Sequence, residues 1–143
     1  MRIALGSDHA GFALKENLKA YLEENGHEVI DCGCFGTASV NYPVFAKEVS
    51  KLVAAGGCER GLLICFTGIG MSIAANRVKG IRAALCRSCD EAFMTRQHND
   101  ANILVLGAKY TSEIDARVIL QTFLETPFSE GERHKLRISL IEE

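Results

Sequence analysis

The sequence predicts an α/β fold, in the form of a three-layer, doubly wound, Rossmann-like five-stranded parallel sheet with flanking helices. Two observations lead to this prediction. Short apolar runs alternate along the chain with amphipathic stretches of helical length, which is the order that parallel βαβ units require. The run at residues 61–66 is apolar throughout, as expected of a central strand that helices cover on both faces.

The five apolar runs predict the strands of the sheet. They lie at residues 2–7, 28–32, 61–66, 81–86 and 102–107. The stretches of helical length lie at residues 11–25, 42–55, 71–78, 90–98, 112–125 and 131–143. No repeat, low-complexity tract or linker interrupts this order, so we expect a single domain over residues 1–143.

The first two helices show the local signals most clearly. In the first, an apolar stripe with helical spacing begins at Phe12, and the sequence predicts that Lys15, Glu16 and Lys19 lie outside it. Gly26 follows as a typical helix-ending glycine. Pro43 suits the first turn of the second helix, because the missing amide hydrogen is not needed there.

Composition limits the class of protein. A chain of 143 residues with 48% hydrophobic and 24% charged residues can bury a normal core and is not of disordered type. The net charge of −2, with its charges scattered, argues against nucleic acid or a membrane surface as a partner. No segment approaches the ~18 apolar residues of a spanning helix, and the apolar N-terminal run is too short for a signal peptide. We therefore expect a cytoplasmic protein.

The cysteines are expected to stay reduced in that compartment. There are six, and only Cys86 and Cys89 have the C-x-x-C spacing. No second pair stands at zinc-site spacing, so the sequence predicts no metal site. Most of these thiols are expected to serve as small apolar fillers of the core.

Ligands of doubly wound folds bind at the carboxyl ends of the strands. The residues that follow the predicted strands are therefore the first candidates for a site. Asp8 and His9 follow the first strand, the segment 65–70 the third, Arg87 the fourth and Lys109 the fifth.

The segment 65–72 reads Cys-Phe-Thr-Gly-Ile-Gly-Met-Ser, at a predicted strand-to-helix turn. Its glycines allow a ligand to approach the backbone, and free amides at a helix start suit a phosphate or a developing oxyanion. Such amides also favour a reactive thiolate at Cys65. Spacing alone leaves a second reading, in which Cys65 only packs at the end of a buried strand.

Three other groups each allow a functional and a structural reading. Asp8 can act on a substrate, or it can cap the next helix, while His9 can bind a phosphate. His98 and Asn99 can hold sugar hydroxyls, or His98 can be purely structural. The helix at 131–143 carries Arg133, His134 and Arg137 at spacings of three and four, as a phosphate site or as a solvated basic face.

Together, these motifs resemble the type B ribose-5-phosphate isomerases and their relatives, the galactose-6-phosphate isomerase subunits. The matching segments follow one another in order over nearly the whole chain. They are residues 6–11, 41–43, 64–65, 67–76, 80–83, 96–102, 131 and 133–134.

The resemblance implies an aldose–ketose isomerase that interconverts ribose 5-phosphate and ribulose 5-phosphate through an enediolate, without metal or cofactor. It implies that Cys65 transfers the proton between C1 and C2. Thr67 and the amides of Gly68, Ile69 and Gly70 would stabilise the enediolate oxygens.

The remaining roles implied by the resemblance concern the sugar ring and the phosphate. His98 would open the furanose ring with help from Asp8, and Asn99 would hold sugar hydroxyls. The phosphate would be bound by His9, Arg133 and Arg137. The family's sites lie between subunits of a homodimer or homotetramer, so that His98, Asn99 and Lys109 would come from a partner chain.

Two residues depart from the family pattern. Phe66 stands where a glycine is usual, and Lys109 where an arginine is common. If that glycine needs a positive φ, Phe66 strains the loop; otherwise its ring reshapes the pocket. Both changes keep a hexose phosphate, such as allose or galactose 6-phosphate, open as an alternative substrate.

Two other classes of protein fit less well. A non-catalytic, nucleotide-binding module of flavodoxin-like build would use the loop at 68–70 but has no use for Cys65 with His98. The full dinucleotide fingerprint, with its third glycine, is also missing. A thiol-redox protein would need a C-x-x-C motif at a helix start, which the chain lacks.

Overall fold

The computed structural model describes residues 1–143 and contains one five-stranded sheet and six helices. Every strand runs parallel to its neighbours, in the order β2-β1-β3-β5-β4. The strands are β1 (Arg2–Ser7), β2 (Glu28–Asp31), β3 (Arg60–Cys65), β4 (Ala83–Leu85) and β5 (Ile103–Gly107). The helices are α1 (Phe12–Glu24), α2 (Tyr42–Ala54), α3 (Ile69–Ala75), α4 (Cys89–Asn99), α5 (Glu113–Glu125) and α6 (Glu132–Ile141). The predicted α/β fold class is confirmed.

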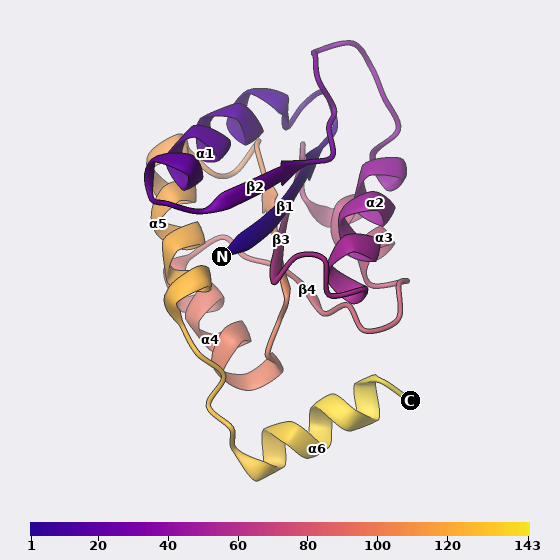
Figure 1. The fold of residues 1–143 in the computed structure, drawn as a ribbon, viewed down its shortest axis with the longest axis vertical. Helices are drawn as coiled ribbons and strands as arrows, with labels where there is room; N and C mark the ends of the chain where they lie inside the picture. The colour runs from indigo at the N-terminus through magenta and orange to yellow at the C-terminus, as the bar shows by residue number, and fades with distance from the viewer.

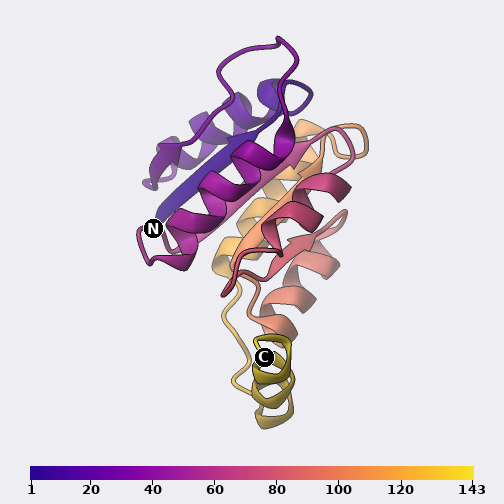
Figure 2. The same ribbon diagram turned by 90° about the vertical axis from the view of Figure 1, so that its right-hand side faces the viewer.

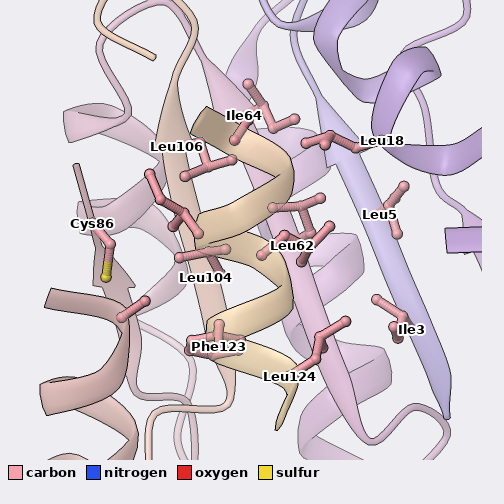
Figure 3. Close-up of a cluster of buried hydrophobic side chains, with 14 of the residues drawn as sticks. Ile3, Leu5, Leu18, Leu62, Ile64, Cys86, Leu104, Leu106, Phe123 and Leu124 are labelled. Carbon is pink, nitrogen blue, oxygen red and sulfur yellow. The ribbon is translucent and has the colours of Figure 1, made fainter. Parts of the chain in front are cut away.

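Helices α1, α4 and α5 cover one face of the sheet, and α2 and α3 cover the other (Figures 1 and 2). The strands supply both cores, because successive side chains point to opposite faces. Leu62 and Ile64 point into the core under α1 and α5, where Figure 3 shows them beside Leu104 and Leu106. Leu63 and Cys65 point to the side of α2 and α3. The sulfur of Cys65 therefore faces the helix that follows it.

The strand order brings two distant loops together. Strand β5, rather than β4, lies beside β3, with Gly107 opposite Cys65. Two backbone hydrogen bonds then connect the loop after β5 to the end of β3. The amide of Ala108 donates to the carbonyl of Cys65 (2.9 Å), and the amide of Lys109 donates to the carbonyl of Phe66 (2.8 Å).

Helix α3 begins two residues before the predicted 71 and ends before the predicted 78. It begins at Ile69 because Gly68, in the left-handed conformation with φ 81°, allows the turn directly after the strand. It ends because the side chain of Asn76 bonds to both backbone groups of Ala83, at 2.9 and 2.8 Å, which ties the chain to β4. Strand β4 is shorter than predicted, since Ile81 still belongs to a turn that closes on Val78.

One prediction for α1 is wrong. Lys15 was expected outside the apolar stripe, but its side chain is completely buried. It forms an ion pair with Asp31 at the end of β2, with 2.7 Å between Nζ and Oδ2. A buried lysine is tolerable only with such a partner, and the sequence pattern gave no sign of it.

Helix α6 and the loop at residues 32–41 lie at opposite ends of the molecule, and α6 stands apart from the sheet (Figures 1 and 2). None of the six helices combines the length and the apolar character needed to cross a membrane.

Candidate active site

Cys65 ends β3 at the carboxyl edge of the sheet, with only 5% of the residue exposed. Its sulfur accepts a hydrogen bond from the amide of Gly68, at 3.2 Å. Gly68 is required here both by its positive φ and by the space available, since a Cβ atom would lie 2.5 Å from the side chain of Leu85. The turn thus holds the thiol beside the start of α3.

The same turn presents further hydrogen-bonding groups. The hydroxyl of Thr67 accepts from the amide of Ile69 at 3.2 Å, and the amides of Gly70 and Met71 have no acceptor within the chain. A Cβ atom on Gly70 would lie 2.4 Å from the ring of Tyr42, so the first residue of α2 closes over this turn. Tyr42 was not assigned a role from the sequence, although it lies in one of the motifs that carry the family resemblance.

Asp8 and His9 lie at the same edge, because the register pairs Ser7 with Ile64 and so brings Asp8 level with Cys65. The Asp8 carboxylate accepts a hydrogen bond from the amide of Gly11, at 3.0 Å. This bond satisfies an amide at the start of α1, as the capping alternative predicts, although the N-cap position itself is Gly11. His9 accepts a hydrogen bond at Nδ1 from the amide of Val40, 3.2 Å away.

Phe66 and Lys109 form the rim of this edge. The Lys109 ammonium lies 5.4 Å from the centre of the Phe66 ring, close enough for a cation–π contact. Phe66 does not have a positive φ, so of the two alternatives the strained loop is excluded. The residue is 52% exposed, which leaves its ring to shape the entrance.

The other predicted site residues lie at the amino ends of the strands, opposite to Cys65. Helix α4 runs back against the strands, so His98 and Asn99 come at its end near the amino ends of the strands. The Asn99 carbonyl accepts from Nε of Arg82, directly before β4, at 2.8 Å. The ring of His98 stacks on that of His134 in α6, with 4.4 Å between centres and 13° between planes.

His134 joins α6 to α4, and cations surround it. Its pKa is lowered, first because the ring is removed from water and then because His98, Arg133 and Arg137 are near. Arg133 and Arg137 are exposed and lie on the same helix. The structure therefore contains two separate groups. Cys65, Thr67, Asp8, His9 and Lys109 lie at the carboxyl ends of the strands, and His98, Asn99, Arg133 and Arg137 lie at the other end. Lys109, which the resemblance assigned to a partner chain together with His98 and Asn99, lies instead beside Phe66 of its own chain.

The cysteines outside the site have the properties of core residues. All six are free, and no three or more His, Cys, Asp or Glu side chains gather as metal ligands. Burial, together with Glu91, raises the pKa of Cys86 to about 12, and burial is the main cause that raises that of Cys32 to about 11. These two thiols remain protonated at neutral pH.

The model of the Ribose/Galactose Isomerase family matches residues 3–141 of the chain. The chain belongs to this family. Ribose-5-phosphate isomerase B of Escherichia coli is 43% identical over 140 residues, which cover 98% of this chain and 93% of that protein. The resemblance that the sequence motifs predicted is confirmed.

Solved structures of relatives have the same fold as this ribose/galactose isomerase. Ribose-5-phosphate isomerase B of Clostridium thermocellum superimposes with a TM-score of 0.98 at 47% identity, covering 99% of this chain and 95% of that one. The ribose 5-phosphate isomerase of Thermotoga maritima gives 0.96 at 50% identity, with 99% and 97% covered. The chain is therefore a sugar isomerase, and its candidate site lies where the family motifs meet.

Proposed function

We propose that this isomerase interconverts ribose 5-phosphate and ribulose 5-phosphate through an enediolate, with Cys65 as the proton-transfer group. The observation that carries the proposal is the position of its sulfur, held by the Gly68 amide beside the free amides of Gly70 and Met71. The relatives named ribose-5-phosphate isomerase B support ribose 5-phosphate as the substrate.

The reaction moves one proton from C2 to C1 and a second proton from O2 to O1. Cys65 as thiolate removes the proton from C2 of the open-chain aldose. The C2–H electron pair forms the C1–C2 double bond of the enediolate, while the π pair of the C1 carbonyl moves onto O1. The negative charge on the oxygens is stabilised by Thr67 and by the turn from Gly68 to Gly70, whose free donors are the amides of Gly70 and of Met71 beside it. The thiol then returns the proton to C1 while the proton of the C2 hydroxyl passes to O1, so that the C2–O2 bond becomes the carbonyl of the ketose. One base and oriented donors suffice for this chemistry.

The complete site is proposed to need two chains. His98, Asn99, Arg133 and Arg137 lie too far from Cys65 to act on a sugar bound beside it in the same chain. A second copy can supply them, because α6 extends away from the sheet (Figure 1). A cavity of about 590 Å³ lies between the C-terminal end of α6 and the residues before β4, and it leaves room there for part of a second chain. Ile73 of α3 and Phe93 of α4 are exposed apolar residues that such a partner would cover. A homodimer or a dimer of dimers meets this requirement.

A direct comparison of substrates tests the proposed function. Wild-type protein is expected to convert ribose 5-phosphate with a kcat/KM at least about tenfold above that for allose or galactose 6-phosphate, since an extra carbon must fit past the Phe66 ring. Ketose formation is measured for all three sugars. A clear preference for a hexose phosphate would replace the proposed substrate with the alternative.

Phe66 is expected to restrict the size of the substrate. In Phe66→Gly, kcat/KM for the hexose phosphates should rise by about tenfold relative to that for ribose 5-phosphate, because removal of a ring from the entrance frees space. Phe66→Ala is the companion variant, because it also removes the ring but does not add the backbone freedom of glycine. An unchanged ratio in both variants would remove Phe66 from substrate selection.

Arg137 is expected to bind the phosphate. Arg137→Ala should raise KM by about tenfold or more and leave kcat within about threefold, since the phosphate contact is equal in ground and transition states. Lys135→Ala is the matched control, because Lys135 is also a cation of α6 but is paired with Glu130 at 3.1 Å. Equal KM values for the two variants would exclude Arg137 from the phosphate site.

A further inference from the structure

Lys15 and Asp31 form the most deeply buried ion pair of the chain. The Lys15 ammonium is within 2.8 and 2.7 Å of the two carboxylate oxygens of Asp31 and 2.9 Å from Glu16. The side chain of Lys15 is fully buried and that of Asp31 is 8% exposed. Replacement of such a pair by apolar residues is often neutral or stabilising, so stability gives little reason for it.

The carboxylate also determines the conformation of the loop that begins here. Oδ1 of Asp31 accepts the amide of Gly33 at 2.9 Å. Burial by itself would raise the pKa of Asp31, but the hydrogen bonds from Lys15 and Gly33 outweigh it and lower the pKa. Asp31 therefore remains ionised at neutral pH and continues to accept the hydrogen bond from Gly33 in the loop.

The loop is next tied to the end of β1, directly before the site. The amide of Ser7 donates to the Gly33 carbonyl at 2.6 Å, and the amide of Cys34 donates to the Ser7 carbonyl at 2.8 Å. These two bonds place residues 33 and 34 beside the end of β1, directly before Asp8 and His9. The start of the loop is thus held on one side by the ion pair and on the other by β1.

The far part of the loop reaches His9. The amide of Val40 donates to Nδ1 of His9, at 3.2 Å, so that the neutral imidazole must carry its proton on Nε2. Nε2–H has no acceptor within the chain and is then the donor available to an anion. Tyr42, two residues after Val40, closes over the turn at Gly70.

We propose that Lys15 and Asp31 are positioning residues, which hold the loop at residues 32–41 so that Val40 fixes the tautomer and orientation of His9 for the substrate phosphate. The role of His9 rests on the proposed function. The tautomer and the order of the loop do not, and they can be measured without substrate.

The test replaces the ion pair by an apolar pair of similar size, Lys15→Met with Asp31→Leu. This double variant avoids an unpaired buried charge and is expected to fold. Arg2→Gln with Glu28→Gln is the matched control, because it removes another cation–carboxylate pair between β1 and β2, 3.1 Å apart and exposed, at the far edge of the sheet.

The first measurement is spectroscopic. In wild type and in the control, the nitrogen shifts of His9 should show a single Nε2–H tautomer, and the amides of Gly33, Cys34 and Val40 should exchange slowly. In the Lys15→Met/Asp31→Leu variant, the two ring-nitrogen shifts should converge and the three amides should lose protection. A folded variant with unchanged shifts and protection would overturn the proposal.

The second measurement is kinetic. The apolar pair should raise KM for ribose 5-phosphate about ten- to hundredfold and leave kcat within about threefold, because misplacement of a binding group by ~1 Å is costly. The control should keep both values. Absence of turnover in wild type would contradict the proposed function but leave the spectroscopic result as a test of the loop. If the apolar variant does not fold, Lys15→Met with Asp31→Asn, which leaves no charge on either buried side chain, is measured in the same two ways.

Discussion

Cys65→Ala is expected to lower kcat for ribose 5-phosphate by roughly 10²- to 10⁴-fold, the range of positioned acid–base catalysis. The substitution removes the Cys65 thiol, which is the only group on this turn that can remove a carbon-bound proton. The amides and Thr67 stabilise negative charge but cannot accept a proton. The variant should bind substrate with little change in affinity, since the phosphate contacts lie elsewhere.

The control for this substitution is Cys58→Ala. Cys58 lies two residues before β3 and Cys65 is its last residue. Both belong to the same core cluster, and they are 4% and 5% exposed. Both substitutions remove one sulfur from the same layer, so their effects on the midpoint of thermal unfolding should be comparable. Only Cys65→Ala should affect turnover.

The proton transfer itself can be followed in deuterated water. Wild type should incorporate solvent deuterium at C2 of recovered ribose 5-phosphate, because the enediolate re-protonates in both directions. Cys65→Ala should lose this exchange together with net turnover. If Cys65→Ala retained kcat within about tenfold of wild type, Cys65 would not be the general base.

Much of the fold could be predicted because the relevant signals are local. The run at residues 61–66 is apolar throughout, as a strand covered on both faces requires, and strand geometry then divides Leu62 and Ile64 from Leu63 and Cys65 between the two cores. Pro43 marks the start of a helix that indeed begins at Tyr42. The candidate residues after the strands could be found for the same reason, since a carboxyl edge is defined as soon as the strands are.

The features that could not be predicted depend on long-range contacts. The position of β5 between β3 and β4 follows from packing, and it is what places Lys109 beside Phe66. The burial of Lys15 requires an acceptor sixteen residues further along, at the end of β2. Spacing alone also gave no distance between Cys65 and His98, and the two proved to lie at opposite edges of the sheet.

The separation of those two groups leads to the second large expected effect. When Cys65→Ala and His98→Ala chains are co-expressed with different tags and the mixed dimer is isolated, it should regain about half of the wild-type activity per dimer. Each variant alone should be strongly impaired. In the mixed dimer, one site combines both substitutions, while the other takes Cys65 from one chain and His98 from its partner and is intact.

A mixed dimer of Cys65→Ala and Thr67→Ala chains provides the control. Cys65 and Thr67 lie on one turn of one chain, so every site of this dimer retains one substitution and no activity should return. Recovery in the first mixture but not in the second would require that the catalytic edge of one subunit meet the end of α4 of another. If neither mixture recovered activity, although the mixed dimers formed, each chain would have to complete its own site. That result would require α6 and the end of α4 to move to the opposite edge of the sheet, against the stacking of His98 on His134 and the bond from Arg82 to Asn99 that hold them in place.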